Sequence, residues 1–306
     1  MNDTPPRPRL SCESLHACSG CEVALINSGD LFLGLLEQVA IVHFPLIMDH
    51  KYAGGAKERL DLPQAEIGLV SGGVATKKHL EILRTMRAQC QTLVAFGTCA
   101  THGGIPALRN QWTAKQAFHT IFHQDGDESS ATFDDSSLLD RVYSIDEQVE
   151  VDLFLPGCPP HPETIIEAVG SLVSGQQPHC TEKSVCEHCP MVRTGTSQPT
   201  VRRFLNNADY DPAEPVSATR CLLEQGLLCM GPVTASGCGG RETPQCIRAR
   251  VPCRGCYGPV RRQSNQLLDI LNALASKGID YRTIVDRQSL LRFSGAHGLL
   301  KPRIRG

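Results

Sequence analysis

The feature that most constrains this chain is the arrangement of its cysteines. The sequence of 306 residues contains 15 cysteines, and six of them form the Cys-x-x-Cys pairs Cys18/Cys21, Cys186/Cys189 and Cys253/Cys256. Each pair has two single cysteines as companions: Cys99 and Cys158 for the first, Cys221 and Cys229 for the second, and Cys238 and Cys246 for the third. Three sets of four thiolates are what three cubane iron–sulfur clusters require. Because a row of such clusters moves single electrons, the pattern predicts an electron-transfer protein.

Two other uses of so many cysteines fit less well. Disulfide-dense chains are usually small secreted domains made with a signal peptide, whereas this sequence begins MNDTPPRPRL, with no apolar segment after its charges. Zinc ribbons pair two Cys-x-x-Cys units across a short spacer. Here the companions of Cys189 are the single cysteines Cys221 and Cys229. Iron–sulfur clusters are therefore favoured, and zinc at one of the three sites stays open.

Charge and hydropathy narrow the setting of the protein. The formal net charge is −2 and the pI is about 6.6, so the chain lacks the overall basic character of a nucleic-acid-binding protein. The longest apolar runs, such as Leu31 to Leu36, are too short to cross a bilayer. Thiols stay free for metal in reducing compartments. We therefore expect a soluble, cytoplasmic protein that binds no nucleic acid and has no direct membrane span.

The first part of the chain, residues 1–178, has the pattern of an α/β domain. Runs of β-rich sequence alternate with stretches of helical periodicity. We expect strands at 8–11, 38–44, 65–70, 92–96 and 149–155, and helices over 22–36, 79–88 and 163–174. This alternation favours a doubly wound parallel sheet. The acidic, serine-rich stretch over 123–150 is expected to be a solvated loop or insertion.

The cysteines of the first set all follow expected strands. Cys18 and Cys21 come after the first strand, Cys99 comes after TLVAF, and Cys158 comes after VDLFL. Open α/β sheets place ligands at the carboxyl ends of their parallel strands. We therefore expect one edge of the sheet to gather these four thiols, with glycines such as Gly97 letting the backbone approach a bulky cluster.

From residue 179 onward this regularity disappears. Cysteine, glycine and proline crowd together and apolar runs are short, so residues 179–306 are expected to form an irregular domain held by its metals. One helix is expected, over 267–275. Six arginines lie near the third cysteine set: Arg241, Arg248, Arg250, Arg254, Arg261 and Arg262. Three roles stay open for them: to offset the negative charge of a cluster, to form a docking face, or simply to be solvated.

Three cysteines remain outside the sets. Cys12 lies near the first set in the sequence. Cys180 lies near the second set and is an alternative to Cys186 as a ligand, although the Cys-x-x-Cys spacing favours Cys186. Cys90, at the end of an expected helix, is interpreted as a small buried hydrophobic residue.

Several of these motifs resemble the small subunit of nickel–iron hydrogenases. They are CSGCE at Cys18, GTCATHGGIPALRN around Cys99, PGCPP at Cys158, and EQGLLCMGPVTASGCGG with PCRGCYGP in the second half. The resemblance runs over nearly the whole chain. It is strongest to the cytoplasmic group 3 enzymes of the methyl-viologen-reducing (F420-non-reducing) type and to the sulfhydrogenase delta subunit. It implies a flavodoxin-like domain with a proximal cluster, followed by an irregular domain with medial and distal clusters.

The resemblance also names the three cysteine sets. Carried over residue by residue, it implies a proximal set of Cys18, Cys21, Cys99 and Cys158, a distal set of Cys186, Cys189, Cys221 and Cys229, and a medial set of Cys238, Cys246, Cys253 and Cys256. Periplasmic uptake enzymes have a histidine as the first distal ligand and commonly a proline at the second medial position. This chain has Cys186 and Cys246 there. Both differences imply three 4Fe–4S clusters, the medial one at lower potential.

The resemblance places the hydrogen chemistry in another chain. It implies a large-subunit partner that holds the nickel–iron centre, so no residue here is expected to be catalytic. It also implies an electron-acceptor subunit with flavin or iron–sulfur groups. Glu22, directly after the proximal pair, is either a hydrogen-bonding group at the subunit interface or a carboxylate favoured at a helix start.

Two other functions stay open. One is a stand-alone iron–sulfur electron carrier or zinc-stabilised interaction protein. The other is a quinone-reductase subunit of the respiratory complex I type, which has one cluster, adjacent cysteines and no C-terminal cluster domain. No two cysteines of this chain are adjacent.

Overall fold

The chain divides into two compact units. The computed structural model describes residues 7–50, 60–122, 137–178, 182–202 and 208–302. One unit comprises Met1–His179 and Gly295–Gly306, and the other comprises Cys180–Ser294. The sequence placed a boundary between residues 178 and 179 and assigned everything after it to one domain. In the structure the end of the chain belongs with the first unit.

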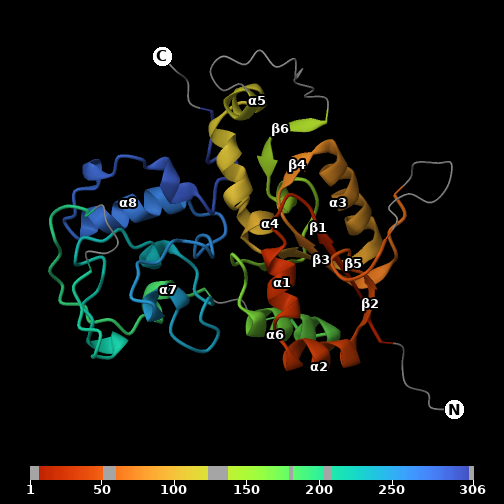
Figure 1. Cartoon of the computed structure of the whole chain (residues 1–306), viewed down its shortest axis with the longest axis horizontal. Coiled ribbons are helices and arrows are strands. Elements are labelled where there is room, and N and C mark those ends of the chain that lie inside the picture. The colour runs from red at the N-terminus through yellow and green to blue at the C-terminus, as the bar shows by residue number, and fades with distance from the viewer. Residues whose placement is uncertain (1–6, 51–59, 123–136, 179–181, 203–207, 303–306) are drawn as a thin grey trace. The chain divides into compact units, whose positions relative to one another are not determined.

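The first unit is built on a five-stranded parallel sheet (Figure 1). Its strands are β1 (Arg9–Ser14), β2 (Ala40–His43), β3 (Ala65–Ser71), β5 (Cys90–Phe96) and β7 (Leu153–Leu155), in the spatial order β2-β1-β3-β5-β7. Every neighbouring pair is parallel. Numbered among themselves, the five strands have the flavodoxin-like order 2-1-3-4-5. The expected α/β fold with a doubly wound parallel sheet is confirmed.

Helices cover both faces of this sheet (Figure 1). Helices α1 (Gly20–Ile26), α2 (Asp30–Gln38) and α6 (Pro162–Val173) pack on one face, and α3 (Lys77–Gln89) packs on the other. Alternate residues of β5 serve the two layers: Phe96 packs with Ile165 of α6, and Leu93 packs with Leu83 of α3. Because both faces are buried, the strands read as nearly continuous apolar runs.

Two local expectations for this unit were wrong. The helix expected over 22–36 is two helices, α1 and α2, separated at Gly29, whose φ is 62°. The strand expected at 8–11 extends to Ser14 as β1 and therefore contains Cys12. Cys90, in contrast, ends helix α3 as expected and is also the first residue of β5.

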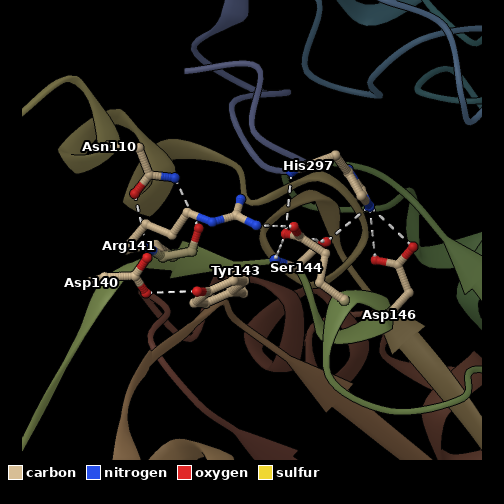
Figure 2. Close-up of polar contacts among 9 residues, drawn as sticks. Asn110, Asp140, Arg141, Tyr143, Ser144, Asp146 and His297 are labelled. Carbon is tan, nitrogen blue, oxygen red and sulfur yellow. Dashed lines mark hydrogen bonds and ion pairs between the residues drawn. The ribbon is translucent and has the colours of Figure 1, made fainter. Parts of the chain in front are cut away.

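Only part of the acidic stretch over 123–150 lies in the described residues. Residues 123–136 lie outside the described part of the chain, and α5 (Ala114–Phe122) precedes them. Contrary to expectation, the stretch also contains strand β6 (Leu138–Tyr143), antiparallel to β4 (Val74–Thr76). The side chain of Asn110 fixes β6, because its Nδ2 donates to the carbonyl of Val142 at 2.9 Å and its Oδ1 accepts from the Val142 N–H at 2.8 Å (Figure 2).

The last described residues return to the first unit. The His297 Nε2 atom lies 3.1 Å from Ser144 Oγ and 3.1 Å from Asp146 Oδ2 (Figure 2). Next to it, the backbone N–H of the fully buried Ala296 donates to the carbonyl of His102 at 3.1 Å. His102 ends α4 (Thr98–His102), the short helix that carries Cys99. The C-terminal segment thus contacts the end of the helix that carries the proximal cysteine Cys99.

The second unit has little regular structure in its described part. Its helices are α7 (Gln245–Arg248) and α8 (Gln266–Ser276), the latter matching the helix expected over 267–275, and they are accompanied by short 3-10 turns. Its core combines apolar residues such as Leu222 and Ile270 with the buried cysteines Cys229 and Cys253. No helix in the described ranges of either unit is long and apolar enough to cross a membrane.

Candidate metal centres

The strand ends that carry the proximal set are aligned across the sheet. The register pairs Ser14 of β1 with Ser71 of β3, Ser71 with Phe96 of β5, and Phe96 with Leu155 of β7. The segments that follow these residues contain the proximal cysteines: Cys18 before α1, Cys21 in α1, Cys99 in α4, and Cys158 after β7. The parallel topology therefore brings segments that are remote in the sequence to one edge of the first unit.

The four proximal thiols lie close enough to influence one another's ionisation. Burial, together with Glu22 and the other three thiols, raises the pKa of Cys21. Burial, followed by the nearby Cys158 and Cys18, raises the pKa of Cys99 to about 12. Cys21 and Cys99 are therefore neutral at pH 7 in the metal-free chain, and the binding of metal, which requires thiolates, releases their protons.

Two glycines leave room beside these thiols. Gly97 has φ 85°, and a Cβ atom there would overlap Cys21 Sγ. Gly104 has φ 52°, and a Cβ atom there would lie 2.7 Å from Cys99 Sγ. The backbone of Ile105 also hydrogen-bonds to the Cys99 thiol. Backbone hydrogen bonds to cysteine sulfur are among the interactions that tune iron–sulfur clusters.

The distal set lines a single cavity of about 180 Å³ in the second unit. All four distal cysteines contribute to its wall: Cys186, Cys189, Cys221 and Cys229. Gly231 keeps the cavity open, because a Cβ atom there would lie 3.2 Å from Cys186 Sγ and 3.4 Å from Cys229 Sγ. Burial raises the pKa of Cys229 to about 12, against hydrogen bonds from the backbone of Gly231 and Cys253.

The medial set lies next to the distal set. The backbone N–H of Cys253 donates to Cys229 Sγ at 3.3 Å. Burial, followed by Cys229, Cys256 and Cys246, raises the pKa of the Cys253 thiol. Burial also raises the pKa of Cys238, and the nearby Cys246 adds to the rise. Cys246 therefore lies near both Cys238 and Cys253, and Cys253 also lies near Cys256, so the four medial thiols are neighbours.

The donor sets fit iron–sulfur groups. Each combines four thiols with backbone hydrogen bonds to sulfur, and in the proximal and distal sets glycines leave space beside the sulfur atoms. In the part of the chain that the structure describes, no three Cys, His, Asp or Glu side chains are close enough to hold a single metal ion. Zinc at one of the three sites stays a sequence-based alternative.

The remaining cysteines differ in position. Cys12 is fully buried in the sheet core, near Cys21. Cys90 is 5% exposed in the core on the opposite face of the sheet, as expected for a small hydrophobic residue. Cys180 lies outside the described residues, so its competition with Cys186 stays a sequence-based alternative.

The structure turns Glu22 inward. It lies in the first turn of α1, is 2% exposed and accepts a hydrogen bond from Ser71 Oγ. Sequence reasoning missed two cations, Arg193 and Lys277, which line the distal cavity. No motif or cysteine spacing marks them, since Lys277 is 48 residues beyond Cys229 in the sequence.

Known proteins match both units of the chain. Residues 18–172 match the family described as the 20 kDa subunit of NADH ubiquinone oxidoreductase. A subunit of the F420-non-reducing hydrogenase of Methanothermobacter thermautotrophicus is 30% identical, over 89% of this chain and 84% of that protein. A vhu subunit of the F420-non-reducing hydrogenase of Methanocaldococcus jannaschii is 31% identical, over 90% of this chain and 91% of that protein. The chain belongs to the hydrogenase small-subunit family.

Two further matches agree with this membership. The delta subunit of sulfhydrogenase 2 of Pyrococcus furiosus is 28% identical, over 82% of this chain and 86% of that protein. A chain in the crystal structure of an NAD+-reducing [NiFe]-hydrogenase in the H2-reduced state superposes with a TM-score of 0.51 and 32% identity, over 57% of this chain and 96% of that chain. As a hydrogenase small subunit, the chain is an electron-transfer subunit of an oxidoreductase.

The extent of the matches bears on the complex I alternative. The family match ends at residue 172, within the first unit. The matches to the F420-non-reducing hydrogenases, in contrast, cover about nine-tenths of the chain and so extend into the second unit. A quinone-reductase subunit without a C-terminal cluster domain would not account for that extension.

Proposed function

We propose that this hydrogenase small subunit carries single electrons between the nickel–iron site of a large-subunit partner and an acceptor protein, through three 4Fe–4S clusters. In the proposal, the proximal set faces the partner, the medial set relays, and the distal set serves the acceptor. The clusters, when bound, supply one-electron storage. The protein supplies twelve thiolates, backbone hydrogen bonds and exclusion of water.

The observation that carries the proposal is the grouping of the cysteines. Twelve of them form three sets of four, and all four cysteines of the distal set line one cavity of about 180 Å³. Neither a disulfide scaffold nor a packing role requires four thiols on the wall of one cavity. Side chains at Gly97, Gly104 and Gly231 would intrude on the thiols of the proximal and distal groups.

Contacts between the medial and distal sets support a relay. The Cys253 N–H donates directly to Cys229 Sγ, so a medial ligand and a distal ligand share a hydrogen bond. Cys229 and Cys253 are also among the most buried cysteines, with 6% and 5% exposure. Burial lowers the access of solvent, which is one of the factors that set cluster potential.

The exposed proximal thiols favour a subunit of a complex over a stand-alone carrier. Cys18 and Cys158 are exposed in the isolated chain, and Val23, two residues after Cys21, is 43% exposed. A partner that covers this edge would shield the proximal centre from water and oxygen. For the same centre, an unaccompanied carrier would leave two ligands in solvent.

The proposed setting is the cytoplasm, with a low-potential flavin or iron–sulfur protein as the acceptor. All 14 cysteines in the described part of the chain are free thiols, which is usual in reducing compartments. Because residues 186 and 246 are both cysteines, each of the three proposed centres has four thiolate ligands. More anionic ligation favours lower potentials.

Co-purification tests the proposed assembly. The tagged chain, isolated anaerobically from its natural host, should bring down a nickel-containing protein in roughly equal amount. The complex should reduce methyl viologen with hydrogen. Recovery of the iron-loaded chain alone, without nickel, would support the stand-alone carrier instead.

A ligand variant tests the electron path. Cys99→Ser should nearly abolish hydrogen-driven dye reduction while the large subunit still contains nickel. The matched control is Cys90→Ala, a buried cysteine outside all three sets, which should keep dye reduction near the wild-type rate. Normal dye reduction in Cys99→Ser would remove Cys99 from the path.

A further inference from the structure

The wall of the distal cavity contains a cation whose position is fixed by a buried carboxylate. Besides the four cysteines and apolar residues, the cavity is lined by Lys277 and Arg193. Lys277 directly follows α8, and its Nζ atom lies 3.5 Å from Glu224 Oε1. The Glu224 side chain is completely buried. Lys277 itself keeps 35% of its side-chain exposure.

The surroundings of Glu224 keep its carboxylate ionised. Its carboxylate accepts hydrogen bonds from the Thr194 N–H at 2.7 Å, from Thr194 Oγ1 at 3.0 Å and from the Gly195 N–H at 3.1 Å. Burial raises the pKa of Glu224, but these hydrogen bonds and Lys277 together leave it below its ordinary value. A buried carboxylate with so many donors is a fixed anchor for a neighbouring ammonium group.

Arg193 differs from Lys277 in how it is held. Its guanidinium donates to the carbonyl of Cys186 and therefore secures the loop of a distal ligand. Lys277, in contrast, pairs with the carboxylate of Glu224. Both cations act against the rise in the pKa of Cys186 that burial causes, and Arg193 acts more strongly than Lys277. Because Arg193 also holds the carbonyl of Cys186, Lys277 is the cation whose charge can be removed without losing that hydrogen bond.

We propose that Lys277, held by Glu224, raises the reduction potential of the distal centre. The inference rests on the proposed function, because it assumes an iron–sulfur cluster on the distal set. On reduction the centre gains one electron from the medial centre; no bond forms or breaks and no proton moves. Its negative charge increases by one, so a fixed cation at the cavity wall favours the reduced state. Lys277 supplies a positive charge at the cavity wall and is not a ligand of the cluster.

Charge variants test this role in the intact complex. At a fixed solution potential, Lys277→Met should lower the reduced-to-oxidised ratio of the distal centre by roughly threefold or more. A tenfold change would correspond to 59 mV for a one-electron couple. The charge-preserving control Lys277→Arg should leave the ratio near wild type. Electron-spin resonance during a redox titration measures it, and the distal signal is assigned as the one altered by Cys186→Ser.

A variant of the anchor gives the opposite sign. Glu224→Gln keeps the shape of the side chain and the Lys277 ammonium but removes one negative charge. It should therefore raise the reduced fraction of the distal centre. Structural damage would not move the two variants in opposite directions while leaving the proximal centre unchanged.

The outcomes separate this inference from the proposed function. An unchanged distal ratio in Lys277→Met, or an equal fall in Lys277→Arg, would overturn the role of Lys277 while three clusters remain. A wild-type chain without a distal iron–sulfur cluster would overturn both the proposed function and this inference.

Discussion

Cys246 decides the type of the medial centre at the scale of a single residue. It is the second residue of α7, after Pro244, and it lies close enough to Cys238 and Cys253 to help raise the pKa of their thiols. With four thiolates, the medial centre should be a cubane that is diamagnetic when oxidised. Because α7 has only its first turn at this point, a proline there is tolerated without breaking a helix.

Substitution of this residue should change the cluster and not the fold. Cys246→Pro should lose one iron from the medial centre and give a 3Fe–4S signal in the oxidised state. Its potential should rise, because one anionic ligand is gone. Iron analysis and electron-spin resonance measure both effects. Unchanged iron content and spectra in this variant would move Cys246 from the ligands to the spare cysteines.

At the scale of an element, the turn after β5 determines access to the proximal thiols. Gly97 follows the last residue of β5 with φ 85° and ψ 162°, and leaves no space for a Cβ atom beside Cys21 Sγ. Gly97→Ala should therefore strain the backbone by roughly 1–3 kcal/mol and displace Cys21. The purified variant should lose about a third of its iron, the share of one cluster of three.

The matched control is a glycine without these constraints. Gly34 lies within α2 with open space around it. Gly34→Ala should leave the iron content unchanged and raise helix stability by up to about 1 kcal/mol, measured by thermal unfolding. Full iron content in Gly97→Ala would show that the turn does not shape the proximal site.

The sequence predicted the sheet better than its surroundings. The strand runs are apolar and ended by turn residues, and their alternation with helices specified a parallel sheet with the proximal cysteines at one edge. The break between α1 and α2 was missed, because Gly29 sits in an otherwise continuous helical pattern. Strand β6 was missed because its acidic neighbours hide a short run in which only Val142 is fully buried.

The cavity residues were harder to predict than the ligands. Cysteine spacing identified the candidate ligands, since a thiol in a repeated pair carries a chemical signal by itself. Lys277 caps α8 and Glu224 lies between Cys221 and Cys229, so the two residues are 53 positions apart in the sequence and meet only in the folded unit. An isolated lysine at the end of a helix has no signal in the sequence that distinguishes it from a solvated one.

At the scale of the whole molecule, the two units differ in what stabilises them. The first unit has a sheet with a core on each face, including the fully buried Leu69 and Leu93. The described part of the second unit has two helices, and its core includes the cysteines Cys229 and Cys253. For such a unit, metal-binding energy becomes folding energy.

Removal of the metals should therefore destabilise the second unit more than the first. After anaerobic chelation of iron, amide hydrogen exchange should lose most protection in 182–202 and 208–294 and keep it in β3 and β5. Restored iron and sulfide should recover the protection of the second unit. Equal protection of both units in the metal-free chain would show that the second unit folds without its clusters.

The central claim is that this subunit holds three 4Fe–4S clusters on twelve cysteines. The most direct measurement is the iron, sulfide and zinc content of the chain purified without oxygen in its complex, after subtraction of the iron of the large subunit. The account predicts about twelve iron and about twelve sulfide per chain, with no zinc in stoichiometric amount. About eight iron, or one zinc per chain, would contradict it.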